Sequence, residues 1–391
     1  MRRYFSPFFL CIAIIALPAS DAPRYRTLHT SALVVDGHND ILARVMKGVN
    51  IETRTRGGHS DLPRFRDGGV DVQLFSVWVP TKLRGEKGWR YALAEIDSLR
   101  AIAARNPDRL AIATRAGDIE RITAGGLLAG VLALEGATCV DGRRDRIIAL
   151  YRRGLRSFGP TWNVSTSWAS SSKDEAAGSV RAGLSANGKS FVRLLDSLGV
   201  LIDLSHSGER TFWDVAATST HPLFASHSGC AAIRAHHRNL TDAQLRAIAK
   251  SDGVAMMTYV PSFLMSNLGT KRIARMREFE ARATALKKRY PRRDAAFLKE
   301  YDALIAAATA EKLCTIDDVV AHILHAVRVA GAAHVGLGSD FDGIGLTPVG
   351  LHDVTDLPML TRALLKKGVS EQDIRGILGA NFLRVWNRVV D

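Results

Sequence analysis

The sequence predicts an α/β fold, a single (β/α)8 TIM-like barrel with one helical insertion near residues 267–312. Three observations lead to this prediction. Short apolar runs alternate with longer amphipathic ones, which is typical of parallel strands covered by helices. About eight such runs are present, as a barrel requires. The length of 391 residues, with 47% hydrophobic and 24% charged residues, suits one large globular domain.

The predicted strands are short apolar runs that follow one another along the chain. In order they are Ser31–Asp36, Val70–Val79, Leu127–Leu134, Leu155–Gly159, Val200–Asp203, Leu223–Ala225, Gly253–Thr258 and His334–Gly338. Between them, apolar residues at helical spacing predict helices at Tyr91–Ala104, Arg143–Arg153, Lys189–Leu198, Asp242–Ala249 and Ile316–Ala330. An open doubly wound sheet is the competing architecture. It is disfavoured because no G-x-G-x-x-G follows the first strand.

Two segments lie outside this alternation. Residues 1–22 read as a signal peptide, since Arg2 and Arg3 precede the apolar run Phe8–Leu17 and small residues follow. The apolar run is short for a membrane-spanning helix, so an uncleaved membrane anchor is the less favoured reading. We therefore expect an exported chain, periplasmic or secreted, whose mature domain (23–391) has no stable membrane span. Residues 267–312 are charged, Ala-rich and helical in pattern; a solvated hairpin and a substrate gate are the two readings.

Composition narrows the function classes. The formal net charge is +14, but no zinc-finger spacing or aromatic-plus-basic repeat accompanies it, so no nucleic-acid partner is expected. A basic surface suited to anionic envelopes or substrates is the favoured reading. Beyond the leader the chain has three cysteines, which is no disulfide framework, although one disulfide stays open in an oxidising compartment.

Chemically active side chains lie where the predicted strands end. They are His38 and Asp40 in "DGHND", Glu135 in "ALEGA", Asp203 and His206 in "IDLSHSG", His227 in "ASHSG", and Asp340 and Asp342 in "GSDFDG". The carboxyl ends of parallel barrel strands converge on one face, so we expect these residues to gather at one mouth. Imidazoles and carboxylates in that number suit first-row divalent metals, zinc above all.

The number of ligands exceeds what one zinc needs. Glu135 is the natural bridge between two metals, and Asp340 could shuttle protons between a metal-activated water and a leaving amine. Asp203, inside an apolar strand, more plausibly braces a ligand than binds metal. Ser205 and Ser226 each precede a candidate histidine, but neither lies in G-x-S-x-G, and a serine or cysteine hydrolase is disfavoured.

Successive motifs resemble those of the membrane dipeptidase (renal dipeptidase) family, peptidase family M19. They are "DGHNDILA", "ALEGA", "GVLIDLSHSG", "ASHSGCAAIRAHHRNLTD", "HVGLGSDFDG" and "GANFLRVW", in family order from about Val34 to Trp386. "HSDLPRFRDGGVDVQLFSVWVP" fits the same pattern. The resemblance implies a barrel hydrolase that cleaves dipeptides with two zinc ions per chain, and it favours a homodimer.

The resemblance also implies a role for each matching residue. His38, Asp40 and Glu135 match the ligands of one zinc. Glu135, His206 and His227 match those of the other, so that Glu135 bridges the two ions. Asp340 matches the catalytic acid/base carboxylate. Arg238, in "HHRNL", matches the arginine that binds the carboxylate of the substrate, for which a planar bidentate donor is suited.

Two places depart from the family pattern. Trp162 stands where mammalian members have a substrate-binding histidine, and Trp can stack on or narrow a pocket but has no imidazole chemistry. Thr258, Tyr259 and Val260 differ at a strand that usually carries polar contacts. These departures keep two rivals open: a metal-dependent amidase, lactonase or phosphotriesterase on the same barrel, and an exported binding protein with a structural metal site.

Overall fold

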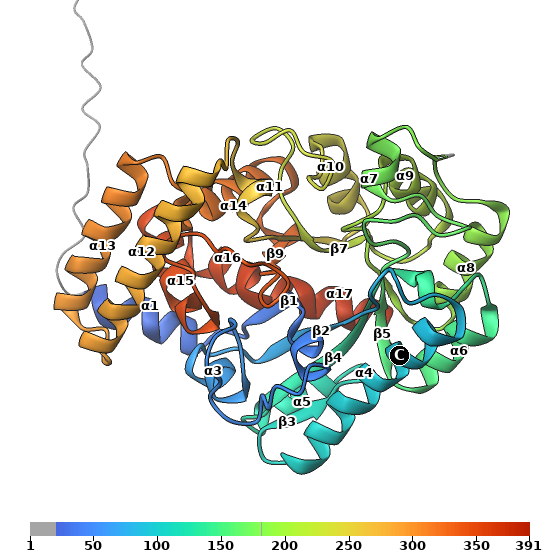
Figure 1. Ribbon diagram of the computed structural model, residues 1–391, viewed down its shortest axis with the longest axis horizontal. Coiled ribbons are helices and arrows are strands. Elements are labelled where there is room, and N and C mark those ends of the chain that lie inside the picture. Colours follow the sequence, from blue (N-terminus) through green and yellow to red (C-terminus); the bar gives the residue numbers. More distant parts are fainter. Residues whose placement is uncertain (1–20, 181) are drawn as a thin grey trace, which may run out of the picture.

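The computed structural model describes residues 21–180 and 182–391 and forms an α/β domain around curled parallel sheets (Figure 1). Apart from Asp21 and Ala22, which begin helix α1, the predicted signal peptide lies outside the described residues. Among the described helices, none is both long and apolar enough to cross a membrane.

All pairing between the strands of the described residues is parallel. The strands are β1 (Val35–Asn39), β2 (Val72–Trp78), β3 (Leu110–Ile112), β4 (Leu128–Glu135), β5 (Leu155–Phe158), β6 (Leu201–Ile202), β7 (Phe224–Ser228), β8 (Val254–Met257) and β9 (Val335–Leu337). One sheet has the order β1-β2-β4-β5-β6 with β3 beside β4, and the other has the order β7-β8-β9. Isolated parallel bridges join Asp203 to Phe224 and Asn39 to Phe341. The α/β class with curled parallel sheets is confirmed, whereas the fully closed barrel stays a prediction.

Each predicted apolar run overlaps one of these strands, and β1, β4 and β7 continue beyond the predicted ends. β3 was not predicted, because its three residues are too few to show a pattern. β1 starts later than expected and continues through Asn39, so His38 is a strand residue and does not follow the strand.

The helices cover the outside of the sheets. They are α1 (Asp21–Thr30), α2 (Ile41–Val45), α3 (Leu62–Asp67), α4 (Gly85–Arg105), α5 (Asp118–Ala124), α6 (Arg144–Arg152), α7 (Ser172–Ala176), α8 (Ala186–Ser197), α9 (Glu209–Thr218), α10 (Asp242–Lys250), α11 (Pro261–Leu264), α12 (Thr270–Arg289), α13 (Ala295–Ala310), α14 (Ile316–Ala330), α15 (Leu357–Lys366), α16 (Glu371–Arg375) and α17 (Asn381–Val389). Short 3₁₀ turns are η1 (Ala137–Cys139), η2 (Ala332–His334) and η3 (Val354–Asp356), and η4 (Gly376–Ala380) is a π-helical turn. All five predicted helices are present.

Local sequence explains where several helices begin. Thr241 and Gln244 form a reciprocal capping box at the start of α10, and Thr315 and Asp318 form one at α14. Each box satisfies backbone N–H groups that the first helical turn leaves without an intrahelical acceptor.

The predicted insertion is a hairpin of α12 and α13, and the chain turns at residues 290–294, where Pro291 interrupts the helical pattern. The hairpin packs on the side of the domain. Lys287 and Arg293 pair with Asp356, and the Tyr301 hydroxyl donates to the Gly350 carbonyl over 3.1 Å. These contacts fit the solvated-hairpin reading, and the gating reading stays untested.

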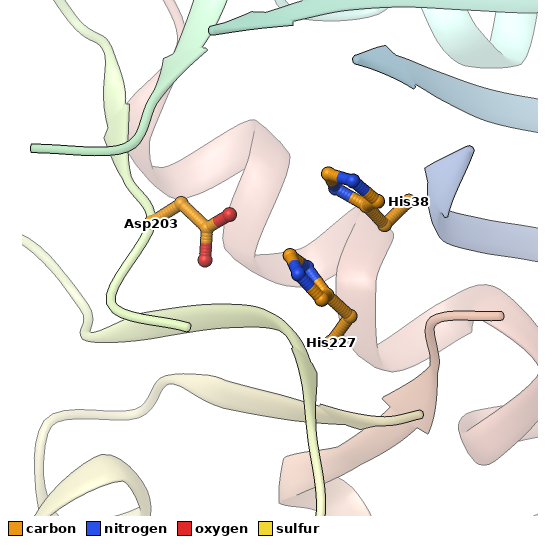
Figure 2. A group of neighbouring side chains, drawn as sticks. All are labelled: His38, Asp203 and His227. Carbon is orange, nitrogen blue, oxygen red and sulfur yellow. The ribbon is translucent and has the colours of Figure 1, made fainter. Parts of the chain in front are cut away.

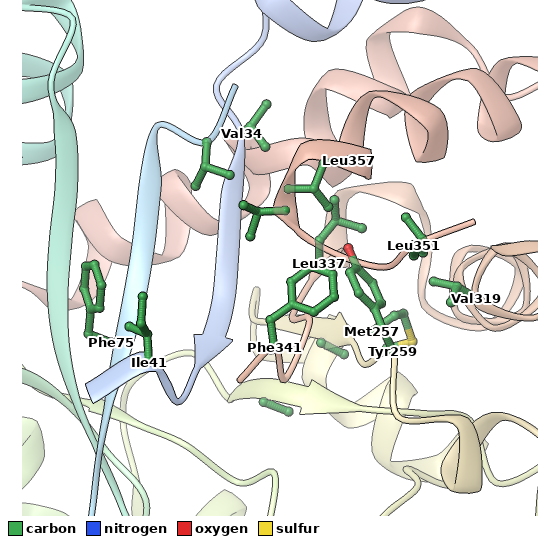
Figure 3. Close-up of a cluster of buried hydrophobic side chains, with 14 of the residues drawn as sticks. Val34, Ile41, Phe75, Met257, Tyr259, Val319, Leu337, Phe341, Leu351 and Leu357 are labelled. Carbon is green, nitrogen blue, oxygen red and sulfur yellow. The ribbon is translucent and has the colours of Figure 1, made fainter. Parts of the chain in front are cut away.

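Two buried clusters hold the domain together. One lies between the strands and the surrounding helices, and part of it, around Phe341 and Tyr259, is drawn in Figure 3. The other contains alternate residues of the strands, such as Ala129, Val131 and Ala133 of β4, packed with Trp386 of α17. Because side chains on a strand alternate between faces, these residues share one face, and Glu135 continues it.

The remaining cysteines, Cys139, Cys230 and Cys314, are buried and free. The disulfide left open by the sequence is therefore not formed. Burial raises the pKa of the Cys139 and Cys230 thiols to about 12, which makes both thiols unreactive at neutral pH.

Candidate metal centre

The first ligand pair lies at the end of β1. The His38 Nε2 atom is 3.5 Å from an Asp40 carboxylate oxygen. Regular strand alternation does not create this pair, because the β1–β2 register shifts between Asp36 and Asn39, and Asp40 already has non-extended dihedral angles. Gly37 allows the strand to curve here: a Cβ on it would lie 2.6 Å from the Ser226 carbonyl oxygen.

Glu135 enters the same space from the last residue of β4. Its Oε2 lies 3.4 Å from His38 Nε2 and accepts a hydrogen bond from the Ser76 hydroxyl over 3.1 Å. Ser76 lies on the same face of the neighbouring strand, where its register partner is Ala133, two residues before Glu135. Although burial alone would raise the pKa of Glu135, the adjacent His38 and His206 hold it well below its ordinary value.

His206 and His227 complete the cluster. His206 lies in the segment that follows β6, and His227 lies in β7. The His206 Nε2 atom is 2.8 Å from Glu135 Oε1 and 3.1 Å from His227 Nε2, and His227 Nε2 is 3.8 Å from the same Glu135 oxygen. Burial lowers the pKa of His206 to about 4 and that of His227 well below its ordinary value. Both imidazoles are therefore neutral, which is the form that binds metal.

The spacing of these donor atoms fits two metal ions. Zinc bonds of about 2.0–2.1 Å in tetrahedral geometry place neighbouring ligand atoms about 3.3 Å apart. The donor atoms of His38–Asp40–Glu135 and those of Glu135–His206–His227 all lie within 4.8 Å of one another in each group, close enough to converge on one ion per group, and Glu135 belongs to both. His38 Nε2, which faces the Asp40 and Glu135 carboxylates, is buried and has no hydrogen-bond partner among the described residues. The donor set therefore fits a pair of divalent ions that share Glu135.

Asp203 lies beside the cluster and braces it. Figure 2 shows Asp203, His38 and His227 pointing into one space, and the three could form a further metal-binding group. However, the Asp203 carboxylate already accepts hydrogen bonds from the backbone and hydroxyl groups of both Ser205 and Ser226, over 2.5–3.1 Å. These bonds occupy its lone pairs, so bracing is the better reading.

The brace extends to His227. The Ser226 hydroxyl lies 2.7 Å from His227 Nδ1 and donates to Asp203, so it can accept the proton of Nδ1. That arrangement leaves the Nε2 lone pair of His227 facing the metal position. The Ser205 hydroxyl accepts from the His227 backbone N–H over 2.9 Å. The two serines thus position a ligand, a role that the sequence pattern around Ser205 and Ser226 does not reveal.

Asp340 lies at the mouth of the site, half-buried on the loop after β9. Its backbone N–H donates to the His38 carbonyl over 3.1 Å, which places the two residues side by side. Burial and the nearby Asp40 and Glu135 raise the pKa of Asp340 well above its ordinary value, against the opposing charges of His38 and Arg238. A raised pKa makes a carboxyl group better suited to both accepting and releasing a proton in general acid–base catalysis.

Asp342 does more than form the ordinary turn suggested by Asp-Gly. Its buried carboxylate pairs with Arg44 over 3.2 Å and accepts the His59 backbone N–H over 2.8 Å. The φ angles of Asp340 and Asp342 are 63° and 65°, so the loop holds two aspartates in the left-handed region. The contacts of Asp342 fix this loop, and with it the position of Asp340.

Arg238 is buried beside the cluster with a charge that is poorly paired. Its side chain is 3% exposed, and Nε and Nη1 have no hydrogen-bond partner among the described residues. Nη2 makes one long bond, 3.4 Å, to the His227 carbonyl. Burial lowers the pKa of Arg238 to about 10, partly offset by Asp340, Glu135 and Asp203. A buried guanidinium with free N–H groups is suited to an incoming carboxylate.

The residues that depart from the family pattern lie in two different places, one beside the metal centre and one in the core. Trp162 is half-buried beside the cluster, with its ring 6.2 Å from that of His206 and 5.2 Å from that of Trp78. Gly136, at φ 84°, makes this approach possible, because a Cβ on it would lie 2.7 Å from the Trp162 Cβ. Tyr259 instead packs on Phe341 in the core, with its hydroxyl buried.

Comparisons with known proteins show what the whole chain is similar to. The family described as membrane dipeptidase (peptidase family M19) matches residues 22–391. The chain is 29% identical to Dipeptidase verJ of Clonostachys rogersoniana over 372 residues, which cover 91% of this chain and 84% of that protein.

Two crystal structures are also similar. The dipeptidase AC, a metallopeptidase of family M19, has a TM-score of 0.76 at 28% identity. A metallopeptidase from Rhodobacter sphaeroides, liganded with a phosphinate mimic of the dipeptide L-Ala-D-Ala, has a TM-score of 0.73 at 26% identity. Each comparison covers 92% of this chain and 99% of the other.

Proposed function

The chain belongs to the membrane dipeptidase family, peptidase family M19, and from this premise we propose that it is an exported binuclear zinc dipeptidase. Membership makes it a metal-dependent hydrolase of the dipeptidase type. The two-ion site, the choice of zinc and the roles of individual residues are the proposal. The observation that carries it is Glu135, whose two carboxylate oxygens face different groups of donor atoms.

In this proposal five side chains hold the ions. His38 and Asp40 bind one, His206 and His227 bind the other, and Glu135 binds both. Zinc would supply Lewis-acid polarisation of the scissile carbonyl and lower the pKa of the attacking water. Asp203, through Ser226, keeps the Nδ1 proton of His227 in place so that Nε2 stays available.

Asp340 moves the proton of the reaction. Hydrolysis forms a C–O bond from water and breaks the C–N bond of the peptide, so one proton must pass from the water to the leaving amine. Asp340 lies next to His38, and its raised pKa suits both acceptance and release of this proton.

Arg238 selects the substrate by its carboxylate. The two unpartnered N–H groups would pair with the C-terminal carboxylate of a dipeptide, which offsets a buried charge. Trp162 would narrow the pocket beside His206 and contact the substrate through its ring face. The dipeptide-like ligand of the similar Rhodobacter sphaeroides enzyme supports this substrate class and makes a D residue at the C-terminal position worth testing.

A panel of substrates tests the proposal. The metal-loaded protein should hydrolyse L-Ala-L-Ala or L-Ala-D-Ala faster than amides, lactones or phosphotriesters without a carboxylate, and chelation should abolish the activity. Faster turnover of the carboxylate-free substrates would favour the amidase or lactonase alternative. Bound metal without turnover of any substrate would favour a binding protein.

Export and assembly are separate parts of the proposal. The N-terminal pattern of residues 1–22 supports export to the periplasm or outside the cell, and N-terminal sequencing of the exported protein would locate the cleavage site. A homodimer is proposed from the resemblance alone, and light scattering of the purified protein would test it.

A further inference from the structure

The positive charge of the chain is concentrated in the hairpin, away from the candidate metal centre. Residues 270–293, which are α12 and the turn after it, hold ten Lys or Arg and two Glu, a net charge of +8 against +14 for the whole chain. The apolar residues of α12 face inward, and its buried positions are Met276, Phe279, Ala283 and Leu286. The cations therefore lie mainly on the outer faces of the helix.

Part of this charge is not used to hold the fold. Lys287 and Arg293 pair with Asp356, and Arg275 pairs with Glu311. In contrast, several exposed cations of the hairpin form no ion pair with any described residue, among them Lys271, Arg277, Lys288 and Arg292. Their charges are available to a partner.

The turn of the hairpin adds a cationic cleft. A cleft of about 600 Å³ between α1 and α12 is lined by five cations (Arg26, Arg54, Lys287, Lys288 and Arg293) and two carboxylates (Asp67 and Asp353). Arg54, Lys287 and Arg293 are in ion pairs, so Lys288 and Arg26 are the lining cations without one among the described residues. Arg26 of α1 also donates to the carbonyl groups of Arg292 and Arg293, over 2.6 and 2.5 Å. Helix α1 is therefore fixed to the turn of the hairpin, and Figure 1 shows α1, α12 and α13 together on one side of the domain.

We propose that this cationic hairpin surface, made of Lys271, Arg277, Lys288, Arg292 and the adjoining cleft, docks on an anionic phospholipid bilayer. The position of α1 argues for a membrane. The predicted leader contains the apolar run Phe8–Leu17, which ends only a few residues before α1 begins at Asp21. Until the leader is removed, the hairpin fixed to α1 would therefore be kept next to the membrane that the chain crosses.

The chemistry of the surface favours lipid over nucleic acid. The one aromatic residue of α12, Phe279, is buried, so the helix offers no exposed ring on which bases could stack. Phospholipid headgroups need only positive charge within a Debye length of the surface, and each Lys or Arg near an anionic surface contributes about 1 kcal/mol. Removal of four such cations should therefore weaken vesicle binding by roughly 10²- to 10³-fold.

Co-sedimentation with vesicles tests the proposal. The probes are vesicles of phosphatidylcholine alone and vesicles in which about one third of the lipid is phosphatidylglycerol. The protein is purified in its exported form, so that wild type and variants carry the same N-terminus. We expect binding to the anionic vesicles only, and its loss when salt is raised to about 1 M, where the Debye length is about 3 Å.

Two matched variants distinguish an effect of the hairpin cations on vesicle binding from an effect of net charge. One combines Lys271→Gln, Arg277→Gln, Lys288→Gln and Arg292→Gln. The control combines Lys87→Gln, Arg115→Gln, Lys189→Gln and Arg193→Gln, which are equally exposed, form no ion pair with a described residue and lie outside the hairpin. Both remove four charges, so both proteins have the same net charge.

The hairpin variant should bind anionic vesicles at least about 10²-fold more weakly than wild type, whereas the control should stay within a few-fold. Circular dichroism and hydrolysis of a dipeptide should be unchanged in both. An equal loss of binding in the two variants, or no binding of the wild type to anionic vesicles, would overturn the proposal. Tighter binding to a DNA duplex than to the vesicles at the same salt would assign the surface to nucleic acid instead.

Discussion

Replacing Arg238 by Met tests substrate recognition without disturbing the metal ligands. Met retains much of the apolar stem and removes the guanidinium. In the structure, Nε and Nη1 of Arg238 have no partner among the described residues, so a substrate carboxylate would gain two charge-assisted hydrogen bonds. Such bonds contribute about 1.5–3 kcal/mol each. Their loss corresponds to about 3–6 kcal/mol, which is a 10²- to 10⁴-fold drop in kcat/KM.

The assay compares two substrates with each enzyme. The kcat/KM of wild type should be roughly 10²- to 10⁴-fold higher for a dipeptide than for the same dipeptide with a C-terminal amide. Arg238→Met should lose this preference because it has no guanidinium with which to bind the carboxylate. Thermal stability provides the control. The charge of Arg238 is buried and its pKa is lowered to about 10, so its removal should leave Tm unchanged or raised.

A uniform effect would refute this reasoning. If Arg238→Met slowed hydrolysis of the dipeptide and of its amide by the same factor, Arg238 would not be recognising the carboxylate. A large fall in Tm would mean that the guanidinium has a structural partner in solution and that the lost activity reports on folding.

Three further predictions concern the metal, the proton and the pH dependence of folding. Asp340→Asn should lower kcat by about 10²- to 10⁴-fold while metal content stays near that of wild type; full activity would exclude the proton transfer. Asp203→Ala should weaken metal affinity by about 10- to 100-fold, measured by competition with a chelator, because His227 loses its brace; unchanged affinity would contradict this. Burial raises the pKa of Asp71 from 3.8 to about 6, so the folded state holds this proton more tightly than the unfolded state and stability falls as pH rises from about 4 through 6, by at most about 3 kcal/mol. Asp71→Asn should remove that fall and be more stable than wild type at pH 8 in denaturant unfolding; lower stability there would contradict the assignment.

The sequence predicted those parts of the fold that depend on long apolar patterns. Every predicted strand and helix is present because burial on a sheet or a helix face demands a regular spacing over many residues. The three residues of β3 carry no such signal. The exact end of β1 was also missed, since the local curvature near Gly37 depends on contact with Ser226, which is distant in the sequence.

Convergence of the candidate ligands was predictable because the ends of parallel strands meet at one edge. The supporting contacts were not. Ser76, Ser205 and Ser226 brace Glu135 or His227 through bonds between strands, and a serine in the sequence does not reveal its acceptor. Likewise, Asp-Gly at Asp342 has the pattern of a turn, and only the fold shows its pairing with Arg44.

The central claim is that Glu135 bridges two metal ions, and metal stoichiometry tests it most directly. Metal-stripped protein is titrated with Zn²⁺, and bound metal and dipeptide hydrolysis are measured on the same samples, for wild type and for Glu135→Gln. We expect wild type to bind two ions per chain and to become active as they bind, whereas Glu135→Gln should bind at least one ion more weakly and lose activity. Saturation of wild type at one ion, or hydrolysis that persists in the metal-stripped protein, would contradict the account.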